Sequence, residues 1–144
     1  MKLKYASLAF PLILVIMVSG CTQTPIIVEL KLDTSSLNIN NDTTSSSFIT
    51  ATIIRDDNGD NATLCMLKFP NTFDNVYVLD ADGKRTSQLQ PISLKGAGRQ
   101  GTTQFKVFAM KVGYSQATFN LAVELWCDNS KVLNQDKQIS ISIV

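Results

Sequence analysis

Apolar and polar residues alternate along several stretches of this chain. Residues 28–32 read Val-Glu-Leu-Lys-Leu, and residues 138–143 place isoleucine at every second position. A period of two is typical of a β-strand with one buried face and one face in water. The predicted strands cover residues 26–32, 48–55, 62–69, 76–79, 104–110, 117–127 and 138–144, with a weaker edge strand at 89–94 where Pro91 interrupts the pattern.

Turn-forming residues separate the predicted strands. Clusters of Asp, Asn and Gly occupy residues 56–61 and 80–84, and a glycine-rich segment occupies residues 96–101. No stretch beyond the N-terminal segment shows a helical period. This arrangement predicts an all-β chain that folds as a single antiparallel β-sandwich of roughly seven to nine strands.

The parity of the strands predicts the core. Residues two apart in a strand point to the same face, so one alternating set lies inside. Residues 33–47 are rich in Ser, Thr and Asn and are either a linker or an edge segment held by Leu37 and Ile39. The predicted core consists of Val28, Leu30, Ile49, Ala51, Ile53, Leu67, Phe119, Leu121, Val123, Leu125, Ile139, Ile141 and Ile143.

Two segments carry a family resemblance. Residues 32–37, Leu-Asp-Thr-Ser-Ser-Leu, are similar to a Ser-rich first strand, and residues 49–59 run from Ile-Thr-Ala-Thr into an Asp-Asp-Asn-Gly turn. Both resemble the immunoglobulin-like domains of prokaryotic surface proteins, including the invasin and intimin type. The resemblance implies an immunoglobulin-like sandwich over residues 26–144 and says nothing about activity.

The N-terminus has the pattern of an export signal. A basic start, Met-Lys-Leu-Lys, precedes an apolar stretch at 5–18 that is shorter than the about 20 residues of a membrane span. Residues 18–21, Val-Ser-Gly-Cys, resemble the lipobox of prokaryotic lipoproteins. That resemblance implies a signal peptide at 1–20, a lipidated N-terminus at Cys21 and a short tether within 21–25. The alternatives are an uncleaved anchor and an ordinary secretory signal with a chance cysteine.

Two further cysteines lie within the predicted sandwich. Cys65 shares the inward parity of Leu67, and Cys127 shares that of Leu125. Because exported proteins meet an oxidising environment, we expect a Cys65–Cys127 disulfide across the sandwich. The alternative is two separate buried thiols, since equal parity does not guarantee proximity. A redox-active pair is disfavoured because the chain has no Cys-x-x-Cys motif.

Two loop segments resemble motifs of ligand-binding sites. Residues 96–101 match G-x-G-x-x-G, but a strand-like sequence follows instead of the helix that a dinucleotide site requires, so we expect an inter-strand loop. Asp56, Asn58 and Asp60 alternate and are weak candidates for calcium ligands. The loop lacks the glycine and the closing carboxylate of an EF-hand, and turn formation alone explains its composition.

Three other positions have two interpretations each. Trp126 has outward parity, so it either contacts a sugar or partner or is covered by a neighbouring loop or edge strand. Asn41 and Asn61 each begin an Asn-x-Thr sequon, which matters only if the source cell glycosylates its exported proteins.

Composition excludes several classes of function. The chain has 144 residues, no histidine and a net charge of +1. Without histidine, the Ser-His-Asp and Cys-His arrangements and most zinc enzymes are excluded. The near-neutral charge gives no electrostatic signature of nucleic-acid binding. Since no nucleophile with an adjacent base is evident either, the sequence predicts neither an enzyme nor a cofactor.

These observations together predict a lipoprotein of the cell envelope, held to a membrane by the lipid on Cys21 and facing the periplasm or the exterior. The expected role is binding or structural, such as adhesion, envelope assembly or service as an accessory subunit. The expected partner is another envelope protein or a surface ligand. The alternative is an exported protein that binds a small ligand or a metal ion with its inter-strand loops.

Overall fold

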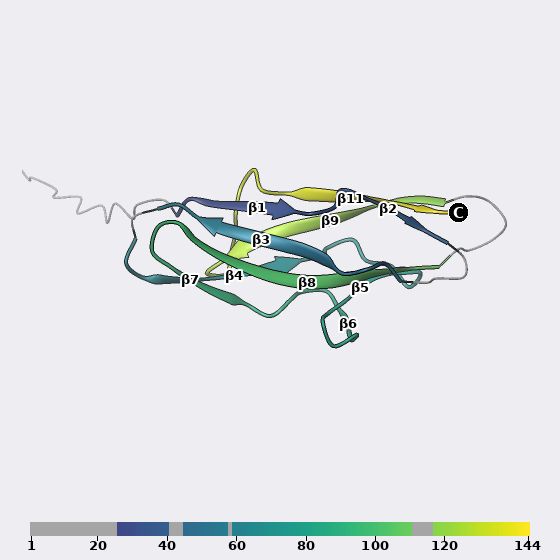
Figure 1. Ribbon diagram of the computed structural model, residues 1–144, viewed down its shortest axis with the longest axis horizontal. Coiled ribbons are helices and arrows are strands. Elements are labelled where there is room, and N and C mark those ends of the chain that lie inside the picture. Colours follow the sequence, from purple (N-terminus) through teal and green to yellow (C-terminus); the bar gives the residue numbers. More distant parts are fainter. Residues whose placement is uncertain (1–25, 41–44, 58, 111–116) are drawn as a thin grey trace, which may run out of the picture.

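Two β-sheets packed face to face make up the computed structural model of this protein, which describes residues 26–40, 45–57, 59–110 and 117–144 (Figure 1). The first sheet has the spatial order β1 (Val28–Leu32), β3 (Ile49–Arg55), β8 (Arg99–Ala109), β5 (Val76–Leu79) and β6 (Arg85–Thr86). The second has the order β2 (Ser36–Ile39), β11 (Lys137–Ile143), β9 (Ala117–Cys127), β4 (Ala62–Lys68) and β7 (Ile92–Lys95), and β10 (Ser130–Lys131) pairs with β9.

The order of the strands in the two sheets defines the fold class. The order β1-β3-β8-β5 in one sheet and β4-β9-β11 in the other corresponds to the two sheets of an immunoglobulin domain. The predicted all-β, immunoglobulin-like sandwich is therefore confirmed. The described ranges contain eleven strands rather than the predicted seven to nine, and two of them, β6 and β10, are only two residues long. Within the same ranges, no helix is long and apolar enough to cross a membrane.

One pairing differs from the predicted antiparallel arrangement. β2 pairs with β11 in parallel, with Ser36 opposite Ser140 and Ile39 opposite Ile143. The reason is that the chain leaves β1, crosses to the other sheet within a few residues and continues in the same direction, where it meets the edge of β11 (Figure 1). The edge interpretation of residues 33–47 is confirmed for this strand, since Ile39 is buried and Leu37 packs against the core.

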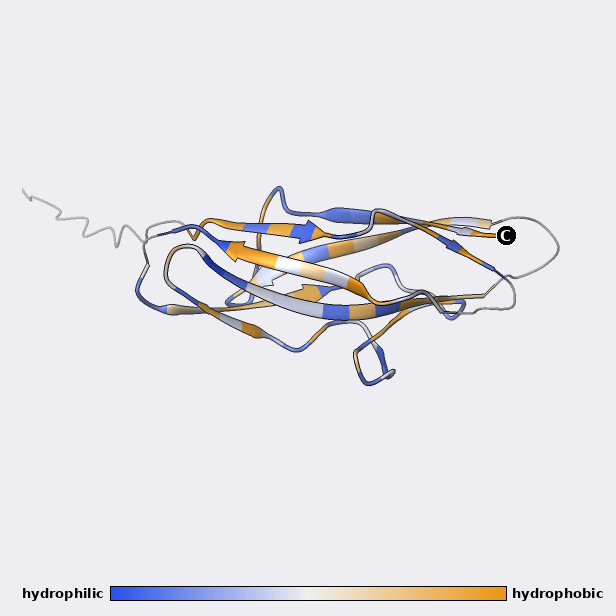
Figure 2. Ribbon diagram, in the orientation of Figure 1, coloured by the Kyte–Doolittle hydropathy of each residue, from blue (hydrophilic) through white to orange (hydrophobic). Residues whose placement is uncertain are grey.

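The core lies between the sheets and follows the predicted parity. Figure 2 shows hydrophobic and hydrophilic residues alternating along the strands. All but one of the predicted core residues are buried. Phe119 is the exception: it lies near the start of β9, at the rim of the sandwich, and is only partly buried against the core.

The glycine-rich segment is both a turn and the start of a strand. Gly96 and Gly98 have φ values of 80° and 67°, which favour glycine, and they form the turn between β7 and β8. The predicted loop at 96–101 is wrong beyond this turn, because β8 already begins at Arg99 and Gly101 pairs with Ile53. A Cβ at Gly101 would lie 2.5 Å from Cγ2 of Ile92, so this glycine permits the close approach of β7.

Candidate functional site

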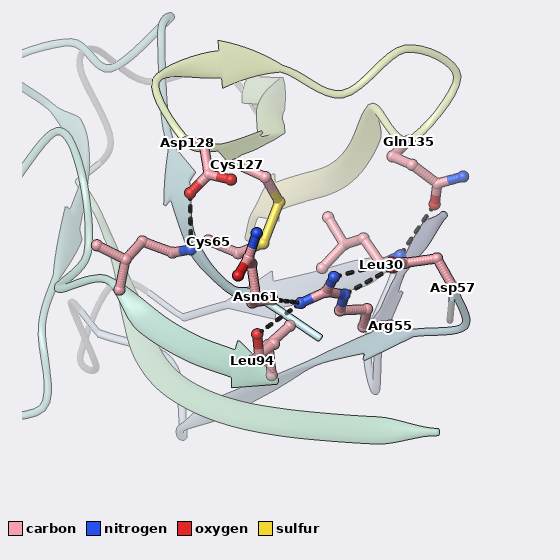
Figure 3. Close-up of a disulfide and its surroundings, with 10 residues drawn as sticks. Leu30, Arg55, Asp57, Asn61, Cys65, Leu94, Cys127, Asp128 and Gln135 are labelled. Atoms are coloured by element: carbon pink, nitrogen blue, oxygen red, sulfur yellow. Dashed lines mark hydrogen bonds and ion pairs between the residues drawn. A yellow bond between two sulfur atoms is a disulfide. The ribbon is translucent and has the colours of Figure 1, made fainter. Parts of the chain in front are cut away.

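A disulfide joins Cys65 to Cys127, as predicted (Figure 3). The two residues face each other in the antiparallel pairing of β4 with β9, and their Cα atoms are 4.1 Å apart. The predicted course of the bond across the sandwich is wrong, because both strands belong to the second sheet. Two cysteines that face each other on neighbouring strands of one sheet also both point inward. Parity alone therefore did not distinguish a bond within one sheet from a bond between the two sheets.

Arg55, at the end of β3, is buried near this disulfide and is only 2% exposed. Its guanidinium forms a two-point ion pair with Asp57, with Nε 2.6 Å from Oδ1 and Nη2 2.8 Å from Oδ2. Its Nη1 donates to the backbone carbonyls of Asn61 and Leu94. Leu94 belongs to β7 in the second sheet, so this one side chain ties the two sheets together at this end of the sandwich (Figure 3).

The loop after β3 holds Asp57 in place. The Gly59 N–H donates to Asp57 Oδ2 at 3.0 Å, and a Cβ at residue 59 would collide with both the guanidinium and the carboxylate. The hydrogen bonds from Arg55 outweigh the effect of burial and lower the pKa of Asp57 from 3.8 to about 2. The hydrogen bonds that Arg55 donates to Asp57 likewise raise the pKa of Arg55. Both groups are therefore ionised at neutral pH.

The ion pair was not predicted from the sequence, which assigned Arg55 only to the end of a strand. The available signal was parity: Arg55 continues the inward series of Ile49, Ala51 and Ile53. A charged residue at an inward position requires a buried partner, and Asp57, two residues later in the chain, is that partner.

A polar pocket of about 580 Å³ opens beside this ion pair. The loop after β3 contributes Asp60, and the loop after β9 contributes Asp128. Thr63 near the start of β4 also lines the pocket. Figure 3 shows Asp128, Asn61 and the Arg55–Asp57 pair around the disulfide. The inter-strand loops at this end thus form a concave polar site of a volume that suits a small ligand.

Of the three weak candidates for calcium ligands, the two that the structure describes do not both line this pocket. Asp60 lines it, whereas Asp56 is exposed and does not. Asn58 lies outside the described residues, as do Cys21, the tether and the Asn41 sequon. Among the residues that the structure describes, no three His, Cys, Asp or Glu side chains are placed to hold a metal ion. Asn61, of the second sequon, is exposed, and its backbone carbonyl accepts a hydrogen bond from Arg55.

A smaller groove of about 330 Å³ lies between the edges of β1 and β11. The Leu30 N–H donates to Oε1 of Gln135 at 2.9 Å. Leu30 stands opposite Ile53 in the β1–β3 ladder, and Gln135 lies just before β11. A side chain thus satisfies a backbone donor of an edge strand, which makes that edge less available to another chain.

Trp126 is covered by charged side chains on the outer face of the second sheet. The Nζ of Lys68 lies 3.8 Å from the centre of the ring, and the ring Nε1 donates to Glu124 at 2.9 Å. Lys131 on β10 pairs with Glu124 at 2.8 Å and with Asp136 at 2.9 Å. Hydrogen bonds from Lys131 and then from Trp126 lower the pKa of Glu124. Trp126 is therefore half-buried under side chains of its own sheet, and neither a loop nor an edge strand lies over it among these contacts.

Replacing Glu124 with alanine is expected to lower the free energy of unfolding by about 1 kcal/mol, because the partly buried Trp126 and Lys131 lose their shared acceptor. Outward parity alone would predict almost no effect. Urea unfolding followed by tryptophan fluorescence measures the change. Ser142→Ala, on the outer face of β11, is the matched control and should stay within about 0.5 kcal/mol of the wild type. Equal stabilities of the two variants would contradict the role assigned to Glu124.

Aromatic and cationic side chains also line the outer face of the first sheet. Tyr77 and Phe108 stack with ring centres 4.5 Å apart, and the Arg85 guanidinium lies 4.5 Å from the centre of the Tyr77 ring. The Nζ of Lys106 lies 4.4 Å from the centre of the Phe48 ring. These contacts make a continuous strip on the half of the sheet away from the polar pocket.

Comparison with known proteins shows only distant structural similarity. No protein family matches the sequence, and no curated protein matches it. Among solved structures, the periplasmic chaperone SfaE is 10% identical over 79% of this chain and 56% of its own, with a TM-score of 0.40. The apo-form Calx CBD1 domain is 7% identical over 81% of this chain and 97% of its own, with a TM-score of 0.46.

A tip adhesin, CupB6 from Pseudomonas aeruginosa, is 10% identical over 83% of this chain and 45% of its own, with a TM-score of 0.39. This chain thus spans about half the length of the chaperone and adhesin chains. Similarity at this level carries no argument about activity or partners. The class of the protein, an immunoglobulin-like β-sandwich, rests on its own strand order and register.

Proposed function

We propose that this protein is a small lipoprotein of the cell envelope, held to a membrane by acyl chains on Cys21, whose sandwich has a binding or structural role. The observation that carries the proposal is the Cys65–Cys127 disulfide. Such bonds persist in oxidising compartments outside the cytoplasm and are rare within it. The lipobox-like sequence that ends at Cys21 supports the anchor.

An anchor at Cys21 would orient the sandwich relative to the membrane. The tether at 22–25 reaches at most roughly 14 Å when fully extended. Ile26, which follows it, lines the polar pocket, whereas the C-terminus lies at the other end of the sandwich (Figure 1). In this arrangement the pocket is close to the membrane and the opposite end faces outward.

Apolar side chains at the outward end support a binding role. Phe48, Phe73 and Met110 are 44–53% exposed. The Met110 N–H donates to the carbonyl of Asn75, which places Met110 beside the turn that contains Phe73. Exposed apolar groups next to aromatic and cationic side chains are typical of surfaces that contact another protein. The proposed partner is therefore another envelope protein or a surface ligand.

Replacing Cys21 with serine is expected to abolish both lipid attachment and lipoprotein-type cleavage, because the thiol is the site of acylation in the proposed lipoprotein. A single acyl chain binds a bilayer only marginally, so stable attachment requires more than one on the mature N-terminus. Detergent phase separation of the full-length protein, made in a bacterial host, measures the distribution. The wild type should enter the detergent phase as a cleaved, lipidated protein, whereas the Cys21→Ser variant should give no such form and remain as uncleaved precursor.

Thr22→Ser is the control for this experiment, because it alters the neighbouring residue and leaves the thiol in place. It should partition like the wild type. If the Cys21→Ser variant also stays in the detergent phase, with its precursor processed normally, the lipoprotein proposal is wrong.

The polar pocket favours a second candidate function, the binding of a small ligand. Loops from both sheets build it, and the buried Arg55–Asp57 pair forms part of its wall. A wall held by hydrogen bonds to the backbone is already formed before a ligand arrives, which lowers the entropic cost of binding.

A further inference from the structure

We propose that the polar pocket beside Arg55 and Asp57 binds a primary ammonium group. The inference deepens the second candidate function, ligand binding by the inter-strand loops, and rests on it. Three features of the pocket carry it: uncompensated negative charge, a hydroxyl without a partner and a lining whose described residues include no aromatic side chain.

The charge of the pocket favours a cation. Its lining includes one basic residue, Arg55, and three acidic ones. Asp57 neutralises Arg55 in the buried pair, whereas Asp60 and Asp128 form no salt bridge with any described residue. Asp128 accepts the Leu64 N–H through Oδ1 at 3.0 Å, so its Oδ2 remains available for a ligand.

Thr63 is the second observation that points to a ligand. The residue is 2% exposed and lines the pocket, and its hydroxyl forms no hydrogen bond with another described residue. Among the described residues, every side-chain nitrogen or oxygen that solvent cannot reach has a hydrogen-bond partner. Because the Thr63 hydroxyl has no partner, solvent must reach it, and it does so from the pocket. A hydroxyl that faces a pocket hydrogen-bonds to water there, and the N–H donor of a ligand can take the place of that water.

The kinds of acceptor in the pocket select a primary ammonium over other cations. A primary ammonium has three N–H donors, and the pocket offers the carboxylates of Asp60 and Asp128 and the hydroxyl of Thr63. A quaternary ammonium has no N–H donor and is bound by aromatic rings, and none occurs among the described residues of the lining. A metal ion is disfavoured because no group of three metal-binding side chains occurs among the described residues.

Primary ammonium groups at a membrane surface come from two sources, namely free amines and the ethanolamine head group of lipids. Both present the same chemistry to the pocket. The lipid source additionally requires the anchored orientation in which the pocket is close to the membrane. The free-amine source does not, so the two can be tested separately.

Isothermal titration calorimetry on the full chain in detergent tests the inference with putrescine, ethanolamine, choline and calcium chloride as probes. Putrescine and ethanolamine should bind, and choline should bind at least about tenfold more weakly because it lacks the N–H donors that the acceptors require. Calcium should give no saturable heat. Binding of choline as tight as that of ethanolamine, or of calcium without the amines, would overturn the inference.

Three substitutions place the amine in this pocket. Asp60→Asn and Asp128→Asn should each weaken putrescine binding about tenfold through the loss of a charge-assisted hydrogen bond. Asparagine at 128 still offers an oxygen to Leu64 and suits the φ of 49° there, so the fold is preserved. Thr63→Val keeps the shape and removes the hydroxyl, and it should weaken binding several-fold. Asp82→Asn, in an exposed turn outside the pocket, makes the same charge change and should have no effect.

Mixed micelles distinguish the two sources of the ammonium group. If the lipid head group is the ligand, phosphatidylethanolamine in the micelles should raise the apparent Kd of putrescine and phosphatidylcholine should not. If neither lipid competes, the ligand is a free amine. Wild-type affinity in all three pocket variants would overturn the inference, whereas the anchor is tested independently by the partition of the Cys21→Ser variant.

Discussion

Reduction of the Cys65–Cys127 disulfide is expected to lower the free energy of unfolding by roughly 2–5 kcal/mol, the range found when native disulfides are removed from small secreted domains. The bond joins residues 62 positions apart, so opening it restores considerable freedom to the unfolded chain. Chemical denaturation of the oxidised and reduced protein, monitored by far-ultraviolet circular dichroism, measures the difference. Both forms should unfold cooperatively and keep the spectrum of a β-protein.

The reduced protein should keep its fold because the bond lies within one sheet. The ladder between β4 and β9 pairs Met66 with Trp126 and continues beyond the cysteines, so it holds the strands in register without the bond. The hydrogen bond from the Asp128 N–H to the Leu64 carbonyl, at 2.8 Å, lies next to the bridge and adds to this.

A double variant, Cys65→Ala with Cys127→Ala, controls for effects of the reductant and should match the reduced wild type. The bridge itself is checked by counting thiols under denaturing, non-reducing conditions. A free-thiol count that includes both Cys65 and Cys127 would refute it and leave the sandwich standing. A helical spectrum in the oxidised protein would contradict the sandwich itself.

Alternation along the strands explains why the fold could be predicted from the sequence. Inward parity is a local property, and each strand with one wet face displays it. The alternation therefore predicted both the presence and the buried residues of three strands, β3, β9 and β11. The early start of β8 at Arg99 was missed because Gly101 breaks the local strand signal, while its pairing with Ile53 comes from the tertiary structure.

The candidate site was less predictable because it depends on which loops meet at one end of the sandwich. Asp60 and Asp128 are far apart in the chain and line one pocket. Local composition placed Asp60 in a turn and made it a weak candidate for a calcium ligand, but it gave no indication of Asp128. Parity placed both Cys65 and Cys127 inward but did not specify their sheet, since strand order is a property of the whole chain rather than of one segment.

Replacing Asp57 with alanine is expected to destabilise the protein by about 3–5 kcal/mol, because the guanidinium of Arg55 would remain buried without its counter-charge. Arg55 also holds the carbonyl of Leu94 in the opposite sheet, so the loss should loosen this end of the sandwich. The double variant Arg55→Met with Asp57→Leu removes both charges and keeps much of the apolar volume. It should recover a large part of the lost stability. Urea denaturation at neutral pH measures all three proteins.

The ion pair also gives the stability of the wild type a characteristic pH dependence. The pKa of Asp57 is lowered from 3.8 to about 2 in the folded protein. A carboxyl group with a lower pKa when folded contributes stability that is complete above its unfolded pKa and is lost as the pH falls through its folded pKa. The free energy of unfolding of the wild type should therefore fall between about pH 4 and pH 2 more steeply than that of the double variant. Asp82→Asn, at an exposed carboxylate, should follow the wild-type profile. Parallel profiles for the wild type and the double variant across this interval would show that the buried pair does not stabilise the fold through its charge.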